Sequence, residues 1–215
     1  MNEETKKLIL GLDVSTSTIG VCLMLVENDE RKLLFTSSIS PKINKNKKGI
    51  EALFLKKNIF ENEFLKKYVD YGIDTVIIEE PLLGSNNIHT VATLLRFNGM
   101  ISESVYRYLG VVPEFISSYE SRKNAFPQLM SIRTFNKKGE KIPEAKLKKS
   151  KPVLFGSFPS DIDKKIIINE LVLELYPNMD RIYNKKNEIA KENYDASDAV
   201  CCVLGWLNKP KEDVQ

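Results

Sequence analysis

The sequence has few of the residues on which thiol and histidine chemistry depend. It contains one histidine and three cysteines in 215 residues, and no two cysteines have the Cys-x-x-Cys spacing of a zinc or redox site. This pattern argues against a structural zinc site and against a nucleophile activated by histidine. Cys22, Cys201 and Cys202 are therefore expected to be buried, reduced thiols.

Long hydrophobic runs are also missing. No stretch approaches the roughly 20 apolar residues that a membrane-spanning helix needs, so we expect no membrane association. The first ten residues, MNEETKKLIL, lack the apolar core and small-residue cleavage site of a secretion signal, which predicts a cytoplasmic protein. Apolar residues make up 42% and charged residues 28% of the chain, as is usual for a globular protein.

The net charge of +3 is small, but the charges are unevenly placed. Residues 121–165 contain twelve Lys or Arg and four Asp or Glu, and residues 41–70 contain eight Lys and four acids. The rest of the chain is therefore acidic. Basic surfaces beside an acidic centre suit a metal-dependent nuclease, because lysine and arginine bind phosphates while carboxylates bind the metal. Lysine-rich solvated faces are the alternative interpretation.

The first half of the chain is predicted to be rich in strands. Two apolar runs within residues 7–26 flank a turn-rich stretch, 13–20, and predict a β-hairpin, with a third strand at 33–40. Apolar residues then recur at helical spacing over 50–69, and Gly72 is expected to end that helix.

A second set of elements follows. The β-branched run 74–80 predicts a buried strand, 88–109 a long amphipathic helix and 111–117 another strand. Two further helices are predicted at 163–176 and 195–207. The expected order is β-β-β-α-β-α-β followed by helices, which indicates an α/β fold with a mixed central sheet flanked by helices.

Residues 118–165 are less regular. They hold four prolines, two glycines and most of the basic charge, and we interpret them as a basic, loop-rich insertion. No internal repeat is apparent. A single domain is expected over residues 1–210, with a frayed tail at 211–215.

Carboxylates stand at the ends of the predicted core elements. Asp13 ends the first strand, Glu79 and Glu80 end the buried strand, and Asp195 and Asp198 open the last helix on one face. A strand that is buried on both faces does not end in acids for packing reasons. If the two strands are neighbours and the helix packs across their ends, these carboxylates converge.

Converging carboxylates repel one another unless they are protonated or bound to cations. Sets of oxygen ligands favour Mg²⁺ or Mn²⁺, and two such ions about 4 Å apart can activate water and stabilise the leaving oxygen of a phosphodiester. Each acid also has a simpler interpretation. Asp13 could be a turn residue, one of the glutamates a solvent-facing strand-end charge, Asp195 a helix N-cap, and Asp198 an acid that favours the first turn.

Three segments together resemble a known family. They are ILGLDVSTSTIG at 9–20, VIIEEP at 76–81 and DASDA at 195–199. In order and spacing, across about 200 residues, they resemble the RuvC family of Holliday junction resolvases, which has the RNase H-like fold. Phage and viral members are the most similar.

The resemblance implies specific roles for the acids. Asp13, Glu79, Asp195 and Asp198 would be the catalytic residues and would bind two Mg²⁺ ions per active site, with Mn²⁺ as a possible substitute. Glu79 matches the family's acid better than Glu80, because it directly follows the apolar strand.

The resemblance also implies partners. The substrate would be branched DNA, above all four-way junctions, cut by paired nicks that leave 5′-phosphate and 3′-hydroxyl ends. The helix at 88–109 would form a homodimer interface, and a phage enzyme would act in the host cytoplasm. Four basic residues would contact DNA: Arg122, Lys123, Lys164 and Lys165.

Some features depart from the family. Cellular members are shorter than this chain at 126–161. A side chain that wedges into a junction could come from the loop 81–87 or from Phe126 or Phe135 of this insertion, and the sequence selects none of them. His89, the only histidine, could contact a phosphate or assist proton transfer, but a capping or surface role is the simpler interpretation.

Three competing functions remain. The first segment also resembles the phosphate hairpin of sugar kinases and actin-like ATPases, although the chain lacks their second lobe and second glycine-rich loop. An RNase H-like nuclease could instead cut flaps, forks or RNA–DNA hybrids with the same chemistry. A DNA-binding homologue without catalytic activity is the third alternative.

Overall fold

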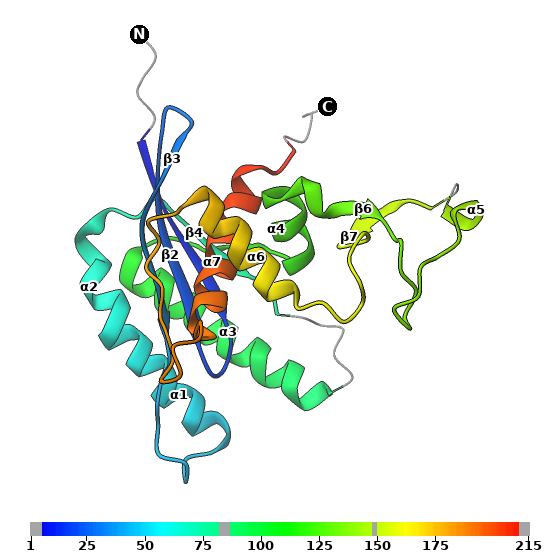
Figure 1. Cartoon of the computed structure of the whole chain (residues 1–215). Helices are drawn as coiled ribbons and strands as arrows, with labels where there is room; N and C mark the ends of the chain where they lie inside the picture. Colours follow the sequence, from blue (N-terminus) through cyan, green and yellow to red (C-terminus); the bar gives the residue numbers. More distant parts are fainter. Residues whose placement is uncertain (1–5, 82–86, 148–149, 211–215) are drawn as a thin grey trace, which may run out of the picture.

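A five-stranded mixed sheet separates two layers of helices (Figure 1). The structure is a computed structural model, and it describes residues 6–81, 87–147 and 150–210. The strand order is β3-β2-β1-β4-β5, with β1, β2 and β3 antiparallel and β4 and β5 parallel to β1. The strands are β1 (Lys6–Val14), β2 (Ile19–Glu27), β3 (Glu30–Ile39), β4 (Thr75–Glu79) and β5 (Glu114–Ile116).

The predicted hairpin is confirmed. β1 pairs with β2 along their whole lengths, and the hydroxyl of Ser15 closes the turn by accepting a hydrogen bond from the backbone N–H of Thr18 at 3.0 Å. β3 begins at Glu30, earlier than predicted, because the β2–β3 connection is a tight turn with Asn28 and Asp29 at positive φ. β5 is shorter than predicted and covers only the middle of 111–117.

The sheet brings two of the predicted acids to one edge. β1 and β4 are parallel neighbours, and Leu12 pairs with Ile78. The next residue on each strand, Asp13 and Glu79, therefore follows at the same end of the sheet. The condition on which the sequence analysis made their convergence depend, that the two strands are neighbours, is met.

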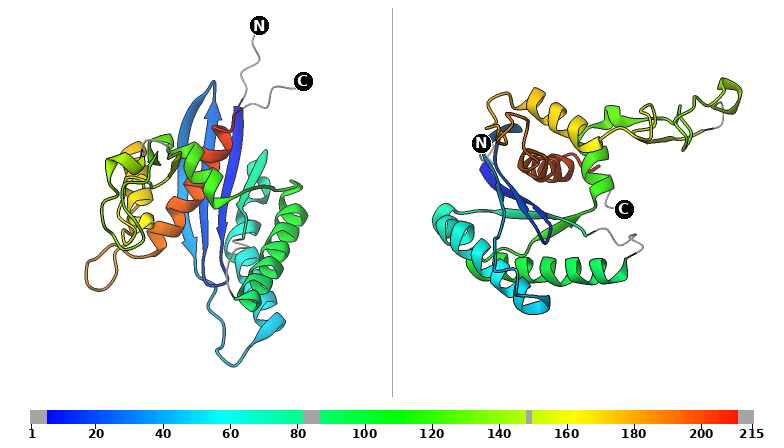
Figure 2. Two further views of the ribbon diagram at one scale, coloured as in Figure 1. Left: turned by 90° about the vertical axis from the view of Figure 1, so that its right-hand side faces the viewer. Right: turned by 60° about the horizontal axis from the view of Figure 1, so that its bottom comes forward.

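One face of the sheet is covered by α1 (Gly49–Phe60), α2 (Lys66–Tyr68) and α3 (Ile88–Leu109) (Figure 2). The helix predicted at 50–69 is interrupted by a π-helical turn at Glu61–Leu65. Glu61 is buried in that turn, where it accepts a hydrogen bond from Ser104 at 2.7 Å and pairs with Lys57 and Arg107. Bulges of this kind accommodate a local packing demand, here a buried carboxylate. Gly72 ends the segment with a left-handed φ of 68°, as predicted.

The opposite face carries α4 (Ser118–Ala125), α6 (Lys164–Leu175) and α7 (Glu192–Leu207). α7 is the central helix of this layer and is buried along most of its length. It lies close to the sheet because β1 and β2 present glycines to it. A Cβ atom on Gly11 would lie 2.5 Å from the carbonyl oxygen of Ala199, and one on Gly20 would lie 2.0 Å from that of Asp195.

The loop-rich interpretation of 118–165 is wrong at its start. Residues 118–125 form α4, whose N-terminus is capped by the hydroxyl of Ser117 and which packs against α7. The close contact is possible because Gly205 has no side chain, so that a Cβ there would lie 2.4 Å from the carbonyl oxygen of Ser121. Polar residues in SYESRKNA concealed this helix, since its apolar contacts come from only a few positions.

Much of the remainder of the segment is an arm that projects from the body, here defined as residues 130–147 and 150–154 (Figure 2). It contains β6 (Met130–Ile132), β7 (Pro152–Leu154) and α5 (Glu144–Leu147), with β6 and β7 paired as a two-stranded sheet. Its base is anchored in the core by Leu129 and Phe155, whose backbones share a 2.8 Å hydrogen bond. Phe126 is also in the core and is 2% exposed, so it is not free to wedge into DNA.

Other sequence predictions have simple outcomes. All three cysteines are buried and free, as predicted. In the part of the chain that the structure describes, no helix is long and apolar enough to cross a membrane. The predicted frayed tail lies outside the described residues.

The glycine contacts of α7 lead to a stability prediction. Gly20→Ala should lower the free energy of unfolding by about 1–3 kcal/mol, because the new methyl group collides with the backbone of α7. Gly99→Ala is the matched control, since nothing lies within 4 Å of a Cβ there and α3 should gain about 0.5–1 kcal/mol. Urea unfolding of both variants checks this, and equal effects would contradict the account of α7 packing.

Candidate active site

The ends of β1 and β4 and the first two turns of α7 bring four carboxyl groups together. Asp13 and Glu79 follow neighbouring strands, while Asp195 and Asp198 project from α7, which crosses those strand ends. Glu79, Asp198 and Asp195 each act electrostatically on Asp13. The residues that the sequence predicted therefore lie in one acidic centre.

Proximity and burial disfavour ionisation of this centre. The pKa of Asp13 is raised well above its usual range by burial first and then by the charges of Glu79 and Asp198. The pKa of Glu79 is raised to about 7, again by burial first and then by Asp198. At neutral pH the centre thus holds more carboxyl groups than its surroundings can readily keep charged.

Two basic side chains are directed into the centre. Arg122, from α4, places Nη2 3.1 Å from Oδ1 of Asp198. Lys165, from α6, places Nζ 3.2 Å from Asp195 and 3.3 Å from Asp198. Burial opposes their charges, but the neighbouring carboxylates hold the pKa of both groups above its usual value. Four carboxyl groups therefore face two cations.

These contacts revise the expected roles of the basic residues. Arg122 and Lys165 are directed toward the acids, and the Arg122 side chain is only 17% exposed. Lys123 and Lys164 are exposed, and the ammonium group of Lys164 lies over the ring of Phe155 at 5.6 Å from its centroid. DNA contact by these four residues stays a prediction.

The additional candidates lie at the margin. Glu80 is exposed and has left the strand, although its backbone N–H still bonds to Ile116 at 2.9 Å. His89 has an exposed side chain in the first turn of α3, and its backbone N–H donates to the N-cap side chain of Asn87. No hydrogen bond or ion pair found among the described residues connects Glu80 or His89 with the four acids.

The start of α7 also differs from the sequence prediction. The helix begins at Glu192 with Lys191 at the N-cap position, so the interpretation of Asp195 as an N-cap is wrong. Asp195 instead lies in the first turn, and Asp198 is buried one turn later at 3% exposure. A buried aspartate needs partners, which Arg122 and Lys165 provide.

Several residues that hold the acidic centre in place were not predicted from the sequence. The buried Asn98 of α3 donates to the backbone carbonyl of Glu79 at 3.3 Å. The thiol of Cys202 donates to the side-chain carboxylate of Glu79 at 3.8 Å. Ser197, beside Asp198, donates to the buried Asn169 of α6 at 2.9 Å. The available signal was a polar residue at a core position of an apolar helix, which indicates a specific hydrogen-bond partner.

The donor set suits a hard divalent cation. It consists of carboxylate oxygens, the ligands that Mg²⁺ prefers. Burial first, and then the neighbouring carboxylates, raise the pKa of Asp13 and Glu79, and a bound cation would favour their ionised forms. In the present arrangement no group of three His, Cys, Asp or Glu side chains in the described ranges is close enough to hold a metal ion. Lys165 lies between Asp195 and Asp198, where it takes up oxygen atoms that a cation would use.

Comparison with solved structures identifies the fold. The chain is similar to Thermus thermophilus RuvC, with a TM-score of 0.52, 11% identity and 92% of each chain covered. It is also similar to T. thermophilus RuvC in complex with a Holliday junction substrate, with a TM-score of 0.54 and 8% identity over 93% of this chain and 91% of the other. The chain therefore has the RuvC-like, RNase H-like α/β fold, as the sequence predicted.

No protein-family model matches the chain, and no curated protein matches it.

The inward direction of Arg122 leads to a prediction with a close control. Arg122→Ala should lower the free energy of unfolding by about 3 kcal/mol at pH 7 without divalent cations, because Asp198 stays buried with one partner fewer. Lys123→Ala, at the next position of α4 and exposed, should change it by less than about 0.5 kcal/mol. Similar values for both variants in chemical denaturation would contradict the role given to Arg122.

Proposed function

We propose that this chain is a Mg²⁺-dependent endonuclease that cuts branched DNA, above all four-way junctions. The observation that supports it best is the acidic centre itself, in which burial and mutual repulsion raise the pKa of Asp13 and Glu79. The RuvC-like fold supports the same conclusion. A structure with that fold is described as a complex with a Holliday junction substrate, which favours junctions as the substrate class.

The proposed metal ligands are Asp13, Glu79, Asp195 and Asp198, which would hold two Mg²⁺ ions or, as substitutes, Mn²⁺. Bound divalent ions would supply a more acidic water and charge stabilisation of the leaving oxygen. The chain's own part is to provide ionised oxygens at a fixed place. Asp13 and Glu79 are held by neighbouring strands, and Asn98 fixes the backbone at Glu79.

In this proposal the side chains of Lys165 and Arg122 differ in how far they can move. Lys165 is 45% exposed in its side chain, so its ammonium group can move away from Asp195 and Asp198 toward solvent or a phosphate. Arg122 is mostly buried between α4 and α7, so it stays beside Asp198 and limits the repulsion there. Lys165 thus compensates the charge of Asp195 and Asp198 when no cation is bound.

Junction cleavage adds a requirement for a dimer, since two strands must be cut by two active sites. We place the interface on α3, whose apolar residues divide between two environments. Ile101 and Val105 are in the core, whereas Leu95 is 47% exposed and lines a groove with Gly99 and Phe115. This exposed side of α3 is the proposed contact with a second copy.

The biological setting is part of the proposal. We propose, from the resemblance of the sequence motifs to phage and viral members of the RuvC family, that the enzyme acts in the host cytoplasm on recombination or replication branches. The products would be paired nicks with 5′-phosphate and 3′-hydroxyl ends.

A cleavage assay tests the function. The purified protein is given a mobile four-way junction, a fork, a linear duplex and an RNA–DNA hybrid, with Mg²⁺ or with EDTA. Paired symmetric nicks in the junction are expected when Mg²⁺ is present and not when EDTA is present. Asp13→Asn should reduce the rate by about 100-fold or more, because losing a ligand oxygen costs several kcal/mol of transition-state stabilisation.

Asp70→Asn is the matched control, because Asp70 is exposed and follows α2 on the opposite face of the sheet. It should cut at the wild-type rate. Cutting of forks or hybrids at the same rate as junctions would support a nuclease but contradict the proposal of a junction resolvase. Binding of DNA without cutting would indicate a homologue that has lost catalytic activity.

A further inference from the structure

Two turns far apart in the chain have nearly the same sequence. RTFNKKGE occupies 133–140 in the arm, and RIYNKKNE occupies 181–188 in the connection between α6 and α7. We name residues 136–140 the arm turn and residues 184–188 the connection turn. The correspondence spans only eight residues, which is too short to be recognised as a repeat from the sequence alone.

The two turns are closed by the same hydrogen bonds. In the arm turn, the side-chain oxygen of Asn136 accepts from the backbone N–H groups of Lys138 and Glu140 at 2.8 and 3.0 Å. In the connection turn, Asn184 accepts from the N–H groups of Lys186 and Glu188 at 2.8 and 3.1 Å.

Further contacts recur at the same 48-residue offset. Each asparagine side chain also donates to the carboxylate of its glutamate, at 2.7 Å in the arm turn and 3.0 Å in the connection turn. The residue before each glutamate has a left-handed φ, 79° at Gly139 and 61° at Asn187. The flanking bridges are Phe135 with Lys141 and Tyr183 with Ile189.

These hydrogen bonds explain why both turns have the same asparagine and the same glutamate. They do not explain why both turns have two lysines between them. Asparagine, glutamate and the glycine or asparagine at positive φ are residues that such turns require. The lysine pairs are all exposed, and in the described part of the chain their ammonium groups form no ion pair or hydrogen bond. They are Lys137 and Lys138 in the arm turn and Lys185 and Lys186 in the connection turn.

The connection turn is fixed to the helix that carries the acids. Asn193, which is 3% exposed, accepts from the N–H of Ile182 at 2.9 Å and donates to the carbonyls of Ile182 and Ala190 at 2.7 Å each. Asn193 precedes Asp195 by two residues in α7. The lysine pair of this turn is therefore held at a defined place relative to the acidic centre.

The arm turn is fixed through the base of the arm. Thr134 donates to the carbonyl of Gly156 at 2.8 Å, and the adjacent Phe155 is buried in the core. Phe155 lies under Lys164, which immediately precedes Lys165 in α6. The connection turn is thus hydrogen-bonded to the helix that carries Asp195, whereas the arm turn is tied to the core at Phe155, the residue that Lys164 contacts.

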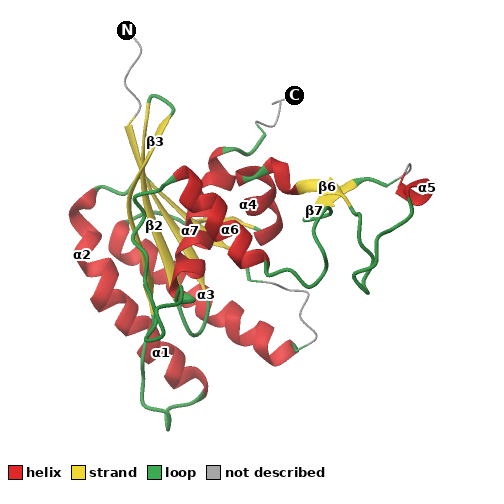
Figure 3. Cartoon of the chain, viewed as in Figure 1, coloured by secondary structure: helices red, strands yellow, loops and turns green. Residues whose placement is uncertain are grey.

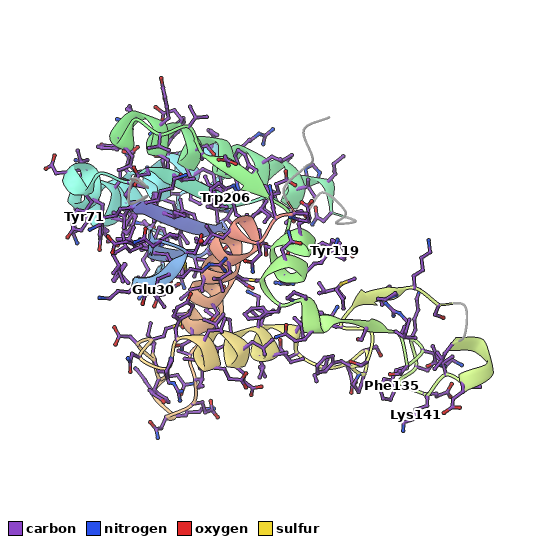
Figure 4. All side chains as sticks on the ribbon, turned by 90° about the horizontal axis from the view of Figure 1, so that it is seen from above. Glu30, Tyr71, Tyr119, Phe135, Lys141 and Trp206 are labelled. Atoms are coloured by element: carbon purple, nitrogen blue, oxygen red, sulfur yellow. The ribbon has the colours of Figure 1, made fainter. Side chains whose placement is uncertain are left out.

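The figures show that the two turns lie on the α6–α7 side of the sheet. Figure 3 shows the irregular connection that leads into α7, and Figure 4 shows Phe135 and Lys141 at the far part of the arm. In Figures 1 and 4 the arm and this connection extend beyond opposite ends of α6. The arm and the connection therefore flank α6, the helix that carries Lys165.

We propose that the arm turn and the connection turn are a matched pair of phosphate-binding elements that contact the DNA backbone on the two sides of the acidic centre. This inference rests on the proposed function and names how the same site holds its substrate. Lysine suits this task because its ammonium group binds phosphate as a point charge and needs no fixed geometry. The rigid turn fixes where that charge is placed.

Salt dependence of binding tests the proposal. Each lysine pair is replaced by glutamine, as Lys137→Gln with Lys138→Gln, as Lys185→Gln with Lys186→Gln, and as all four together. Binding to a four-way junction is measured from 50 to 200 mM salt with EDTA present. Each pair removed should make the fall in affinity over this range about tenfold smaller for every chain that contacts the junction, because two fewer counterions are released per chain. The four substitutions together should have additive effects.

The control is Lys66→Gln with Lys67→Gln, an exposed lysine pair on α2 on the opposite face of the sheet. It should leave the salt dependence unchanged. If both turn variants behave like this control, the proposal is overturned even when the wild type cuts junctions. If the turn variants lose salt dependence as predicted but the wild type never cuts DNA in Mg²⁺, the turn proposal stands and the proposed function fails. No binding by the wild type would overturn both.

Discussion

The close approach of α7 to the β1–β2 hairpin is the constraint on which the site depends. Only glycine fits at positions 11 and 20, because a side chain at either would collide with the backbone of α7. The contact at Gly20 involves the carbonyl of Asp195 itself, so the helix that carries two acids is seated directly on the hairpin that carries the third. Parallel pairing of β1 with β4 then adds Glu79.

This packing has an electrostatic cost. Carboxyl groups that are forced together and partly buried resist ionisation, as the raised pKa of Asp13 and Glu79 shows. α4 and α6 reduce the cost by sending Arg122 and Lys165 into the same space. The layer of helices around α7 therefore does more than cover the sheet, since it supplies the counter-charges of the acidic centre. In our proposal, divalent cations balance the remaining negative charge of the four carboxyl groups. The exposed lysine pairs of the two turns balance the phosphate charges of the DNA.

Much of the core and the acidic centre could be predicted from the sequence, because apolar runs and strand-end acids follow regular spacing. β1, β2, β4 and α3 were expected at nearly their observed positions, and Asp13 and Glu79 were expected to converge on the condition that their strands are neighbours, which the structure meets. α4 was missed because its contacts rely on Gly205 in a different element. The inward direction of Arg122 and Lys165 was also missed, since a basic residue on a helix shows no sign of which partner it faces. The lysine turns were hidden because their similarity lies in hydrogen bonds that span only a few residues.

The most direct test of the account is titration of Mn²⁺ into the metal-free protein by calorimetry, with wild type beside Asp13→Asn. The account predicts two ions per wild-type chain and weaker or incomplete binding by the variant. Affinity should rise from pH 6 to pH 8, because Glu79, with a pKa of about 7, must lose its proton to become a ligand. Absence of binding to the wild type, or identical binding by both proteins, would contradict the assignment of the four carboxyl groups to one metal centre.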